Sequence, residues 1–253
     1  MITSYQRPKS LKQAMKILAV QDSRPLGGGT FLSHLREETF SVVDLQSLGL
    51  NKLTVKGNSL EVGATCSLQT MIESPVTPDA LVTALRLEAP LNIRNMATVA
   101  GSLVTCDGRS PMSAVFLALD AKIYILDTRN VIQETLLSDF ILSPREFLHG
   151  QLILKIEIPV NVKIAFEYVA RTPMDKPIVS TTIAQWPSGR TRVVIGGWGN
   201  TPTLAMDGND ASGIAFAIEN AARDANDEWA SANYRSSISV ILATRCLAQL
   251  AEK

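Results

Sequence analysis

Apolar residues recur at two different spacings along the chain, one typical of helices and one typical of strands. Both spacings occur in the first part of the chain. Ser10 precedes apolar residues at helical spacing, namely Leu11, Ala14, Met15 and Leu18. This arrangement predicts a helix with Ser10 as its cap. Short runs at 41–45, 53–55 and 60–62 predict strands, the last two joined as a hairpin. We assign residues 1–57 to a small α/β lobe.

The middle of the chain carries helices and strands in turn. Residues 79–88 and 110–119 predict helices, and Pro111 stands at a tolerated first-turn position in the second of them. Residues 122–126 and 152–158 predict strands, and the second ends before Pro159. We therefore expect a second lobe over residues 58–160.

The last third changes to successive strands followed by helices. Strands are predicted at 166–169, 178–185 and 191–195, and helices at 213–222 and 233–250. We expect one apolar face on the long helix, made by Tyr234, Ile238, Ile241, Leu242 and Cys246. A sheet followed by helices, without strict alternation, indicates an α+β fold for a third domain over residues 161–253.

Charge and hydropathy remove several classes of function. The chain of 253 residues has 24 basic and 24 acidic residues, so its net charge is zero. It offers no broad basic field for nucleic acid or an anionic membrane. No apolar run reaches the roughly 20 residues that a membrane span needs, and the first 12 residues do not resemble a secretion signal. We expect a cytoplasmic protein.

Cysteine and histidine are too sparse for most metal or hydrolytic chemistry. Cys66, Cys106 and Cys246 lie far apart and form no C-x-x-C motif, which argues against a zinc or iron–sulfur site in this chain. His34 and His149 are the only histidines, and we interpret both as surface residues. No Ser-His-Asp set is evident. We expect no metal site and name no catalytic acid, base or nucleophile.

Glycine gives the first candidate binding feature, at residues 26–32. Gly27, Gly28 and Gly29 have no side chain, so their N–H groups can turn toward a ligand and approach it closely. Successive N–H groups form a concave anion site suited to a pyrophosphate, to which Thr30 adds a hydroxyl group. The sequence is neither a Walker loop nor a Rossmann fingerprint, and a tight turn is the plain alternative.

A second candidate feature is the segment 91–102, which is rich in small and polar residues and poorly periodic. We expect it to be non-regular. A buried segment of that kind needs hydrogen-bond partners, which a bound cofactor could supply. As a plain surface loop it would expose Ile93, Met96 and Val99.

Together, the two features resemble a known family. The sequence Pro-Leu-Gly-Gly-Gly-Thr-x-Leu, followed about seventy residues later by Ile-Arg-Asn-x-Ala-Thr-x-x-Gly, resembles the FAD-binding subunits of the molybdenum hydroxylases. That family includes the medium subunit of carbon monoxide dehydrogenase and the FAD-binding domain of xanthine dehydrogenase. Later similarities, at 117–121, 152–159, Arg171, 193–197 and 231–235, extend over nearly the whole chain.

The resemblance implies a fold and a site. The fold is a two-lobed FAD-binding domain of the PCMH or vanillyl-alcohol-oxidase-like type, followed by an antiparallel sheet with helices. The two segments would clasp the FAD pyrophosphate from two sides, and Asp107 and Ile153 would contact the flavin. The implied cofactor residues are Leu26, Gly27, Gly28, Gly29, Thr30, Phe31, Leu32, Ile93, Asn95, Thr98, Ala100, Gly101, Ser102, Asp107 and Ile153.

The chain departs from the family pattern at several positions in and near this site. Phe31 stands where Asp or Asn is usual, Ala100 replaces the first glycine of a pair, and Pro111 stands where a second Asp is often found. Asp107 is equally compatible with a plain turn before a capped helix. These departures keep a second hypothesis open, in which the chain is a non-catalytic assembly subunit that has lost FAD.

The first hypothesis, also implied by the resemblance, is a flavin-dependent oxidoreductase subunit. A molybdenum-cofactor subunit would oxidise the substrate, and a [2Fe-2S] subunit would relay electrons to FAD in this chain. NAD, a quinone or another molecule would be the acceptor. The complex would be a heterotrimer or its dimer.

Overall fold

The computed structural model describes residues 1–34, 37–144, 150–173 and 175–252. It divides into two compact units, each of which is made of three separate segments of the chain. The first contains Met1–Ser74, Leu91–Thr105 and Lys122–Glu157, and the second contains Pro75–Pro90, Cys106–Ala121 and Ile158–Lys253. Both candidate FAD segments, 26–32 and 91–102, thus belong to the first unit. The division at 57/58 and 160/161 stays a prediction.

A three-stranded parallel sheet opens the first unit, in the order β1-β3-β2. Its elements are β1 (Ile2–Gln6), α1 (Leu11–Leu18), β2 (Ser23–Leu26) and β3 (Phe40–Asp44). The prediction of α1 is confirmed, because Oγ of Ser10 accepts a hydrogen bond from N of Gln13 at 3.3 Å. Apolar residues of α1 pack on Val43 and Leu45 from β3 and the segment that follows it.

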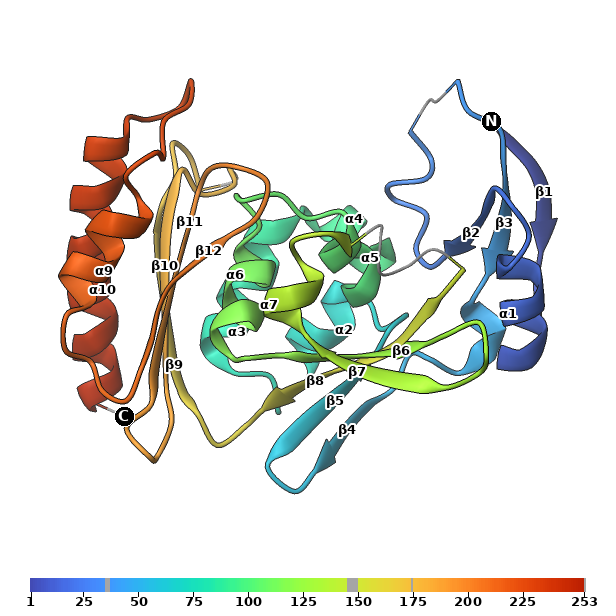
Figure 1. Cartoon of the computed structure of the whole chain (residues 1–253), viewed down its shortest axis with the longest axis horizontal. Helices are drawn as coiled ribbons and strands as arrows, with labels where there is room; N and C mark the ends of the chain where they lie inside the picture. The colour runs from blue at the N-terminus through green and yellow to red at the C-terminus, as the bar shows by residue number, and fades with distance from the viewer. Residues whose placement is uncertain (35–36, 145–149, 174, 253) are drawn as a thin grey trace. The chain divides into compact units, whose positions relative to one another are not determined.

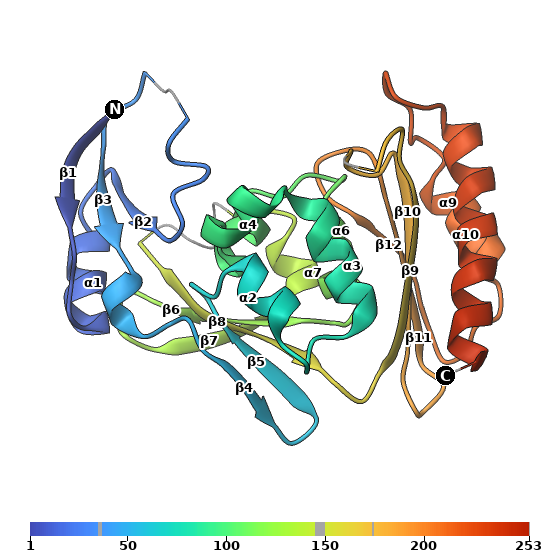
Figure 2. The same cartoon turned by 180° about the vertical axis from the view of Figure 1, so that it is seen from behind.

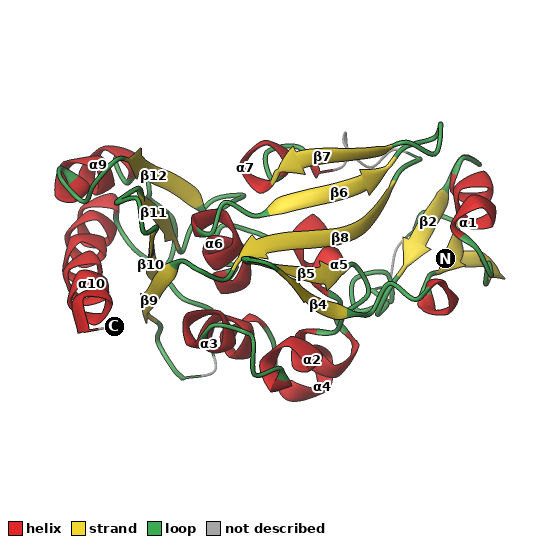
Figure 3. Cartoon of the chain, turned by 90° about the horizontal axis from the view of Figure 1, so that it is seen from below, coloured by secondary structure: helices red, strands yellow, loops and turns green. Residues whose placement is uncertain are grey.

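A five-stranded sheet forms the rest of the first unit, and Figure 3 shows its strands side by side in the order β4-β5-β8-β6-β7. The strands are β4 (Leu53–Lys56), β5 (Ser59–Gly63), β6 (Lys122–Leu126), β7 (Ile132–Leu136) and β8 (Leu152–Pro159). The predicted hairpin is confirmed as β4 and β5, which turn at Gly57 with φ of 58°. The predicted strands at 122–126 and 152–158 are β6 and β8.

Short helices lie on one face of this sheet (Figure 1). They are α2 (Leu68–Glu73), α4 (Leu91–Met96), α5 (Val99–Val104) and α7 (Leu137–Phe140). The expectation that segment 91–102 is non-regular was therefore wrong, since it contains α4 and the start of α5. Each of these two helices has six residues, which is too few turns to produce a visible apolar period.

An antiparallel sheet in the order β12-β11-β10-β9 organises the second unit. Its strands are β9 (Lys163–Val169), β10 (Val179–Gln185), β11 (Thr191–Gly196) and β12 (Thr203–Gly208). The helices α9 (Ile214–Ala221) and α10 (Ala232–Glu252) cover one face, while α3 (Asp79–Glu88) and α6 (Pro111–Ala118) cover the other (Figure 2). All eight residues of α6 are buried. The predicted α+β class is confirmed.

The buried face of α10 agrees with the predicted one at Leu242 and Cys246 but differs at Tyr234 and Ile241. Tyr234 and Ile241 are 41% and 48% exposed, whereas the buried residues are Arg235, Ser239, Leu242, Ala243, Cys246 and Leu250. The prediction followed apolar residues, but the sheet-facing row includes a fully buried arginine and a serine, which shift the face by one residue.

Candidate functional site

The first glycine loop begins where β2 ends. Leu26 is the last residue of β2, and its carbonyl oxygen accepts a hydrogen bond from N of Leu45 at 3.1 Å. Residues 27–30 therefore start at the carboxyl end of a parallel strand, where the chain is free to turn. Gly29 has φ of 73°, in the left-handed region that favours glycine. The sequence hid β2 because Pro25 lies within it, which an edge strand tolerates.

The first loop packs directly against the turn between α4 and α5. A β-carbon on Gly28 would lie 1.6 Å from the carbonyl oxygen of Met96, and one on Gly27 would lie 2.8 Å from Oγ1 of Thr98. No L side chain fits at residue 28 without displacing main chain. The structure thus brings together the two segments that the sequence singled out, as main chain against main chain.

The N–H groups of residues 27–30 are available to a ligand. Among the residues that the structure describes, none accepts a hydrogen bond from these four groups. The loop residues themselves are half-buried. Half-buried main-chain donors need an acceptor, and successive donors on one turn form a site for an anion.

Most N–H groups of the second segment already donate hydrogen bonds to acceptors within the protein. Thr98 caps α5, because its Oγ1 accepts a hydrogen bond from N of Gly101 at 3.2 Å. The N–H of Ser102 donates to the carbonyl oxygen of Thr98 at 2.9 Å. The N–H of Ala100 donates to the carbonyl oxygen of Ala64 at 3.2 Å. Alanine therefore suits position 100, which lies in a helical turn with its N–H directed into the protein.

Residues 64–68 are joined to this second segment by main-chain hydrogen bonds. The N–H of Val99 donates to the carbonyl oxygen of Cys66, and the N–H of Leu68 donates to that of Ala97. The N–H of Ala64 donates in turn to the carbonyl oxygen of Leu154 on β8. Cys66 is fully buried, and burial raises the pKa of its thiol to about 11. The thiol is a packing group here and not a nucleophile.

Other side chains of the predicted site are polar and unengaged, or apolar and exposed. The side chains of Thr30, Asn95 and Ser102 make no hydrogen bond within the described part of the chain. Phe31 and Ile93 are each 38% exposed. Main-chain donors bordered by free polar groups and exposed apolar side chains fit a large ligand that combines an anionic centre with apolar rings, as FAD does.

The two predicted flavin contacts, Ile153 and Asp107, belong to different units of the chain. Ile153 is 4% exposed on β8, beside Leu154, which connects through Ala64 to the second segment. Asp107 belongs to the second unit. Its carboxylate accepts a hydrogen bond from N of Arg109 at 3.0 Å, which is the turn geometry of the plain alternative.

Asp107 takes part in a charged cluster of the second unit. Nζ of Lys176 lies 3.6 Å from a carboxylate oxygen of Asp107 and 3.3 Å from one of Glu88. Burial lowers the pKa of Lys176, but these two carboxylates outweigh it and the net direction is upward. Arg109 donates to the carbonyl oxygens of Lys176 and Pro177 at 2.6 and 3.0 Å. The cluster thus holds the loop before β10 on the loop that carries Asp107.

The described residues contain no group of three or more His, Cys, Asp or Glu that could hold a metal ion. His34 is exposed, and His149 lies outside the described residues. None of the helices in the described ranges combines the length and the apolar character needed to cross a membrane.

Comparisons with known proteins identify the same family as the motifs. Residues 1–161 match the family described as the FAD binding domain in molybdopterin dehydrogenase. The glyceraldehyde dehydrogenase medium chain of Sulfolobus acidocaldarius is 28% identical over 221 residues, which cover 81% of this chain and 78% of that protein.

Solved structures show the same fold. Quinoline 2-oxidoreductase from Pseudomonas putida 86 has a chain that superposes with a TM-score of 0.80 at 23% identity, over 98% of this chain and 96% of that one. Carbon monoxide dehydrogenase from Oligotropha carboxidovorans gives a TM-score of 0.80 at 22% identity, over 97% and 96%.

Proposed function

This chain belongs to the family of FAD binding domains in molybdopterin dehydrogenases, and on that premise we propose that it is the flavin subunit of a multi-subunit oxidoreductase. Its cofactor is FAD. The proposed role is to receive electrons from an iron–sulfur subunit and to pass them to an acceptor such as NAD or a quinone. Bound FAD supplies the redox chemistry, because it accepts electrons singly or in pairs.

The residues of this chain would bind and orient the cofactor. We assign the pyrophosphate to residues 26–32 and 98–102, with the first loop supplying main-chain donors and the second supplying the surface on which that loop rests. The exposed apolar side chains of Phe31 and Ile93 would border the site, together with the free amide of Asn95. Ile153 and Asp107 are the proposed flavin contacts. Positioning and local electrostatics are what a protein contributes to a cofactor of this kind.

One observation carries the assignment of the loop. Four consecutive N–H groups at residues 27–30 have no acceptor in the described part of the chain, and the loop that bears them is fixed by the contact of Gly28 with Met96. A closed tight turn would pair one of these N–H groups with a carbonyl group of the turn itself, and none is paired in this way. A preorganised set of free donors instead supports an anion, and the FAD pyrophosphate is the anion that this family binds.

The partners follow from what this chain lacks. We propose a molybdenum-cofactor subunit and a [2Fe-2S] subunit, in a heterotrimer or its dimer. Cys66 and Cys246 are fully buried, and the described residues hold no metal cluster. The iron–sulfur centre would therefore be carried by another chain, and we assign the molybdenum cofactor to a further subunit of the same assembly. The medium-chain name of the Sulfolobus relative supports a multi-subunit assembly.

An absorption spectrum of the freshly purified chain tests FAD binding. The expected result is a yellow protein with the visible bands of oxidised flavin, or a colourless protein that becomes yellow when FAD is added and then desalted. A protein that stays colourless after incubation with FAD would contradict the proposal. Co-purification of that colourless protein with partner subunits would indicate the assembly subunit that has lost FAD.

Electron transfer needs a separate test on the assembled complex. Addition of the complex's substrate without air should bleach the flavin bands, and addition of NAD or a quinone should restore them. Bleaching by NADH in the isolated chain would identify NAD as the acceptor. A flavin that stays oxidised in a complex whose iron–sulfur centres become reduced would contradict the proposed electron route.

A further inference from the structure

Unpaired positive charge of the first unit gathers around α1. Six basic side chains of this unit form ion pairs with carboxylates, namely Arg7, Arg24, Lys56, Lys122, Arg129 and Lys155. By contrast, Lys9, Lys12 and Lys16 are exposed and form no ion pair with any described residue. These three residues, on α1 or just before its cap, are called the lysine ridge below. A fourth such lysine, Lys52, follows Leu50, which packs on the same apolar cluster as α1.

The lysine ridge is electrostatically unfavourable for the helix that carries it. α1 has no acidic residue in its first turn, and Lys12 lies there beside the positive end of the helix dipole. Lys12 and Lys16 are four residues apart and therefore on the same face, where like charges repel. The first acidic residue of the chain is Asp22. The ridge is thus a local concentration of positive charge on a chain of zero net charge, and it attracts an anionic partner.

The ridge starts at the edge of the sheet that carries the first glycine loop. β1, β2 and β3 are parallel, so their carboxyl ends lie on one edge. Lys9 follows the end of β1, and residues 27–30 follow the end of β2. These two strands are two positions apart in the order β1-β3-β2, which corresponds to about 10 Å. A partner bound to the ridge is therefore close to the proposed pyrophosphate site.

The proposed electron donor has the chemistry that this surface fits. A [2Fe-2S] cluster and the thiolates that hold it form an anion in both oxidation states. Electron-transfer partners commonly meet through small interfaces, and complementary charge guides their encounter. We propose that the lysine ridge binds an acidic surface of the [2Fe-2S] subunit and so guides that subunit to the flavin site. The assignment rests on the proposed flavin function and adds a docking surface to it.

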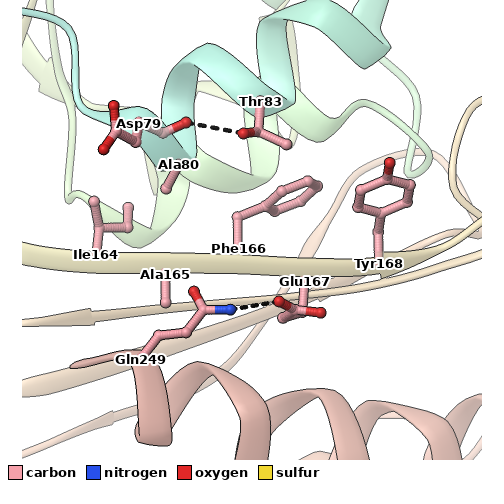
Figure 4. Close-up of a pocket in the computed structure, with 9 residues that line it drawn as sticks. All are labelled: Asp79, Ala80, Thr83, Ile164, Ala165, Phe166, Glu167, Tyr168 and Gln249. Atoms are coloured by element: carbon pink, nitrogen blue, oxygen red, sulfur yellow. Dashed lines mark hydrogen bonds between the residues drawn. The ribbon is translucent and has the colours of Figure 1, made fainter. Parts of the chain in front are cut away.

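The cavity of the second unit carries the opposite charge. Figure 4 shows this space of about 270 Å³ beside β9, lined by Asp79 of α3 and Glu167 of β9 among others. Neither carboxylate forms an ion pair with a described residue, and Glu167 accepts a hydrogen bond from the amide of Gln249 at 2.5 Å. Unpaired negative charge repels an acidic partner. The cavity therefore does not compete with the lysine ridge for the [2Fe-2S] subunit.

Charge reversal in the assembled complex tests the ridge. The complex is captured through a tag on this chain and washed with increasing NaCl, and iron and flavin are measured per chain. Lys9→Glu/Lys12→Glu should lower the affinity for the [2Fe-2S] subunit roughly tenfold, so that iron is lost at lower salt. Arg223→Glu/Arg245→Glu makes the same change in net charge at exposed residues of the second unit and should retain iron like the natural chain.

The same variant separates docking from a structural role. Glutamate at residue 12 suits the positive end of the helix dipole and faces Lys16 as an opposite charge, so thermal unfolding should not occur at a lower temperature. The flavin content should also stay unchanged. A natural chain without flavin contradicts the proposed function itself, whereas a flavin-containing variant that retains iron like the control overturns only the ridge. A variant that loses its flavin assigns the lysines to FAD and overturns the ridge too.

Cross-linking of the natural complex gives a result that needs no variant. A zero-length carbodiimide reagent should link the lysine ridge to carboxylates of the [2Fe-2S] subunit, identified by mass spectrometry. Glu219, Asp224 and Glu228 are exposed and form no ion pair with a described residue, so links from the ridge to these residues would assign it to a second copy of the chain. That outcome overturns the proposal, as do links between the two subunits that never include the ridge.

Discussion

The Cα atom of Gly28 approaches the carbonyl group of Met96 so closely that a β-carbon at residue 28 would lie 1.6 Å from the carbonyl oxygen. The residues are far apart in the sequence, yet their contact fixes the distance between the two segments of the proposed pyrophosphate site. Because both sides of the contact are main chain, a rotamer change cannot relieve the clash that a side chain would cause. Glycine at position 28 is thus a requirement of the site's geometry.

Substitution of Gly28 by alanine should abolish FAD binding. The added methyl group must push the loop off Met96, which displaces the N–H groups of residues 27–30 from the positions that would face the phosphate. The measurement is the ratio of flavin to protein absorbance after FAD addition and desalting, together with thermal unfolding of the apoprotein.

Gly57→Ala is the matched control. Gly57 has φ of 58° in the turn between β4 and β5, and a methyl group added there would meet no atom within 4 Å. The substitution should cost about 1 kcal/mol of backbone strain and leave the flavin content unchanged. If Gly28→Ala retains flavin at the level of Gly57→Ala, the first loop does not form the pyrophosphate site.

The hydroxyl group of Thr98, and not its methyl group, should be needed for the stability of the chain and for FAD binding. Oγ1 of Thr98 caps α5 by accepting from N of Gly101, and the same atom lies against Gly27. Thr98→Ala should cost about 1 kcal/mol of stability and weaken FAD binding, while Thr98→Ser should keep both. Calorimetric titration of the apoprotein with FAD, beside urea unfolding, separates the two effects. Equal behaviour of the alanine and serine variants would refute a capping role.

Much of the fold could be predicted because its apolar pattern is regular. The predicted helix 79–88 and the predicted strand 122–126 agree with the structure at both ends. In each of them the apolar residues keep one spacing from end to end, and that spacing stops clearly on both sides. The strand β2 was missed because Pro25 interrupts it, and α4 and α5 were missed because six residues are too few for a period. In each case the element is held by partners elsewhere in the chain.

The candidate site was only partly visible in the sequence. Glycine and threonine in two segments indicated an anion site, but sequence spacing carries no information about the approach of Gly28 to Met96. Nor could it show that N of Ala100 is already bonded to Ala64, whereas the N–H groups of residues 27–30 have no acceptor among the described residues. These differences depend on long-range packing, which local residue preferences do not report.

Arg235 should contribute more to stability than any exposed charge on α10. Its guanidinium group is fully buried and donates to the carbonyl oxygens of Ile178, Gly197, Ala225 and Ala230 and to the carboxylate of Asp227. Arg235→Leu removes one donor from each of these acceptors and the cationic partner from the Asp227 carboxylate, so a loss of at least about 3 kcal/mol is expected in urea unfolding.

Arg245→Leu serves as the control for Arg235→Leu, because Arg245 is exposed on the same helix. It should change the free energy of unfolding by less than about 0.5 kcal/mol. The substitution Arg235→Lys should recover little, since an ammonium group cannot reproduce the planar fork of donors. A difference of less than about 1 kcal/mol between the two leucine variants would show that the buried network is not a stabilising one.

The ion pair between Arg190 and Asp207 should make stability fall in acid. Nε and Nη2 of Arg190 lie 2.8 and 2.7 Å from the two carboxylate oxygens of Asp207. These hydrogen bonds lower the pKa of Asp207, and they outweigh burial, which raises it; nearby Arg192 lowers it further. Because the folded pKa is lower than the unfolded pKa of about 3.9, folding favours the ionised carboxylate. The contribution is thus complete above the unfolded pKa and disappears as the pH falls through the folded pKa.

Asp207→Asn isolates this contribution from the other carboxylates of the chain. At pH 7 the variant should be less stable than the natural chain by on the order of 1 kcal/mol, a modest value because the pair is about one-third exposed. Urea unfolding at pH 7, 5 and 3 should give a difference that is similar at the first two values and smaller at the third. A difference that stays constant down to pH 3, or grows there, would mean that Asp207 is not held ionised by Arg190. The sign follows from the pairing alone, since a carboxylate without a cationic partner in the same half-buried place would have a raised pKa and the opposite dependence.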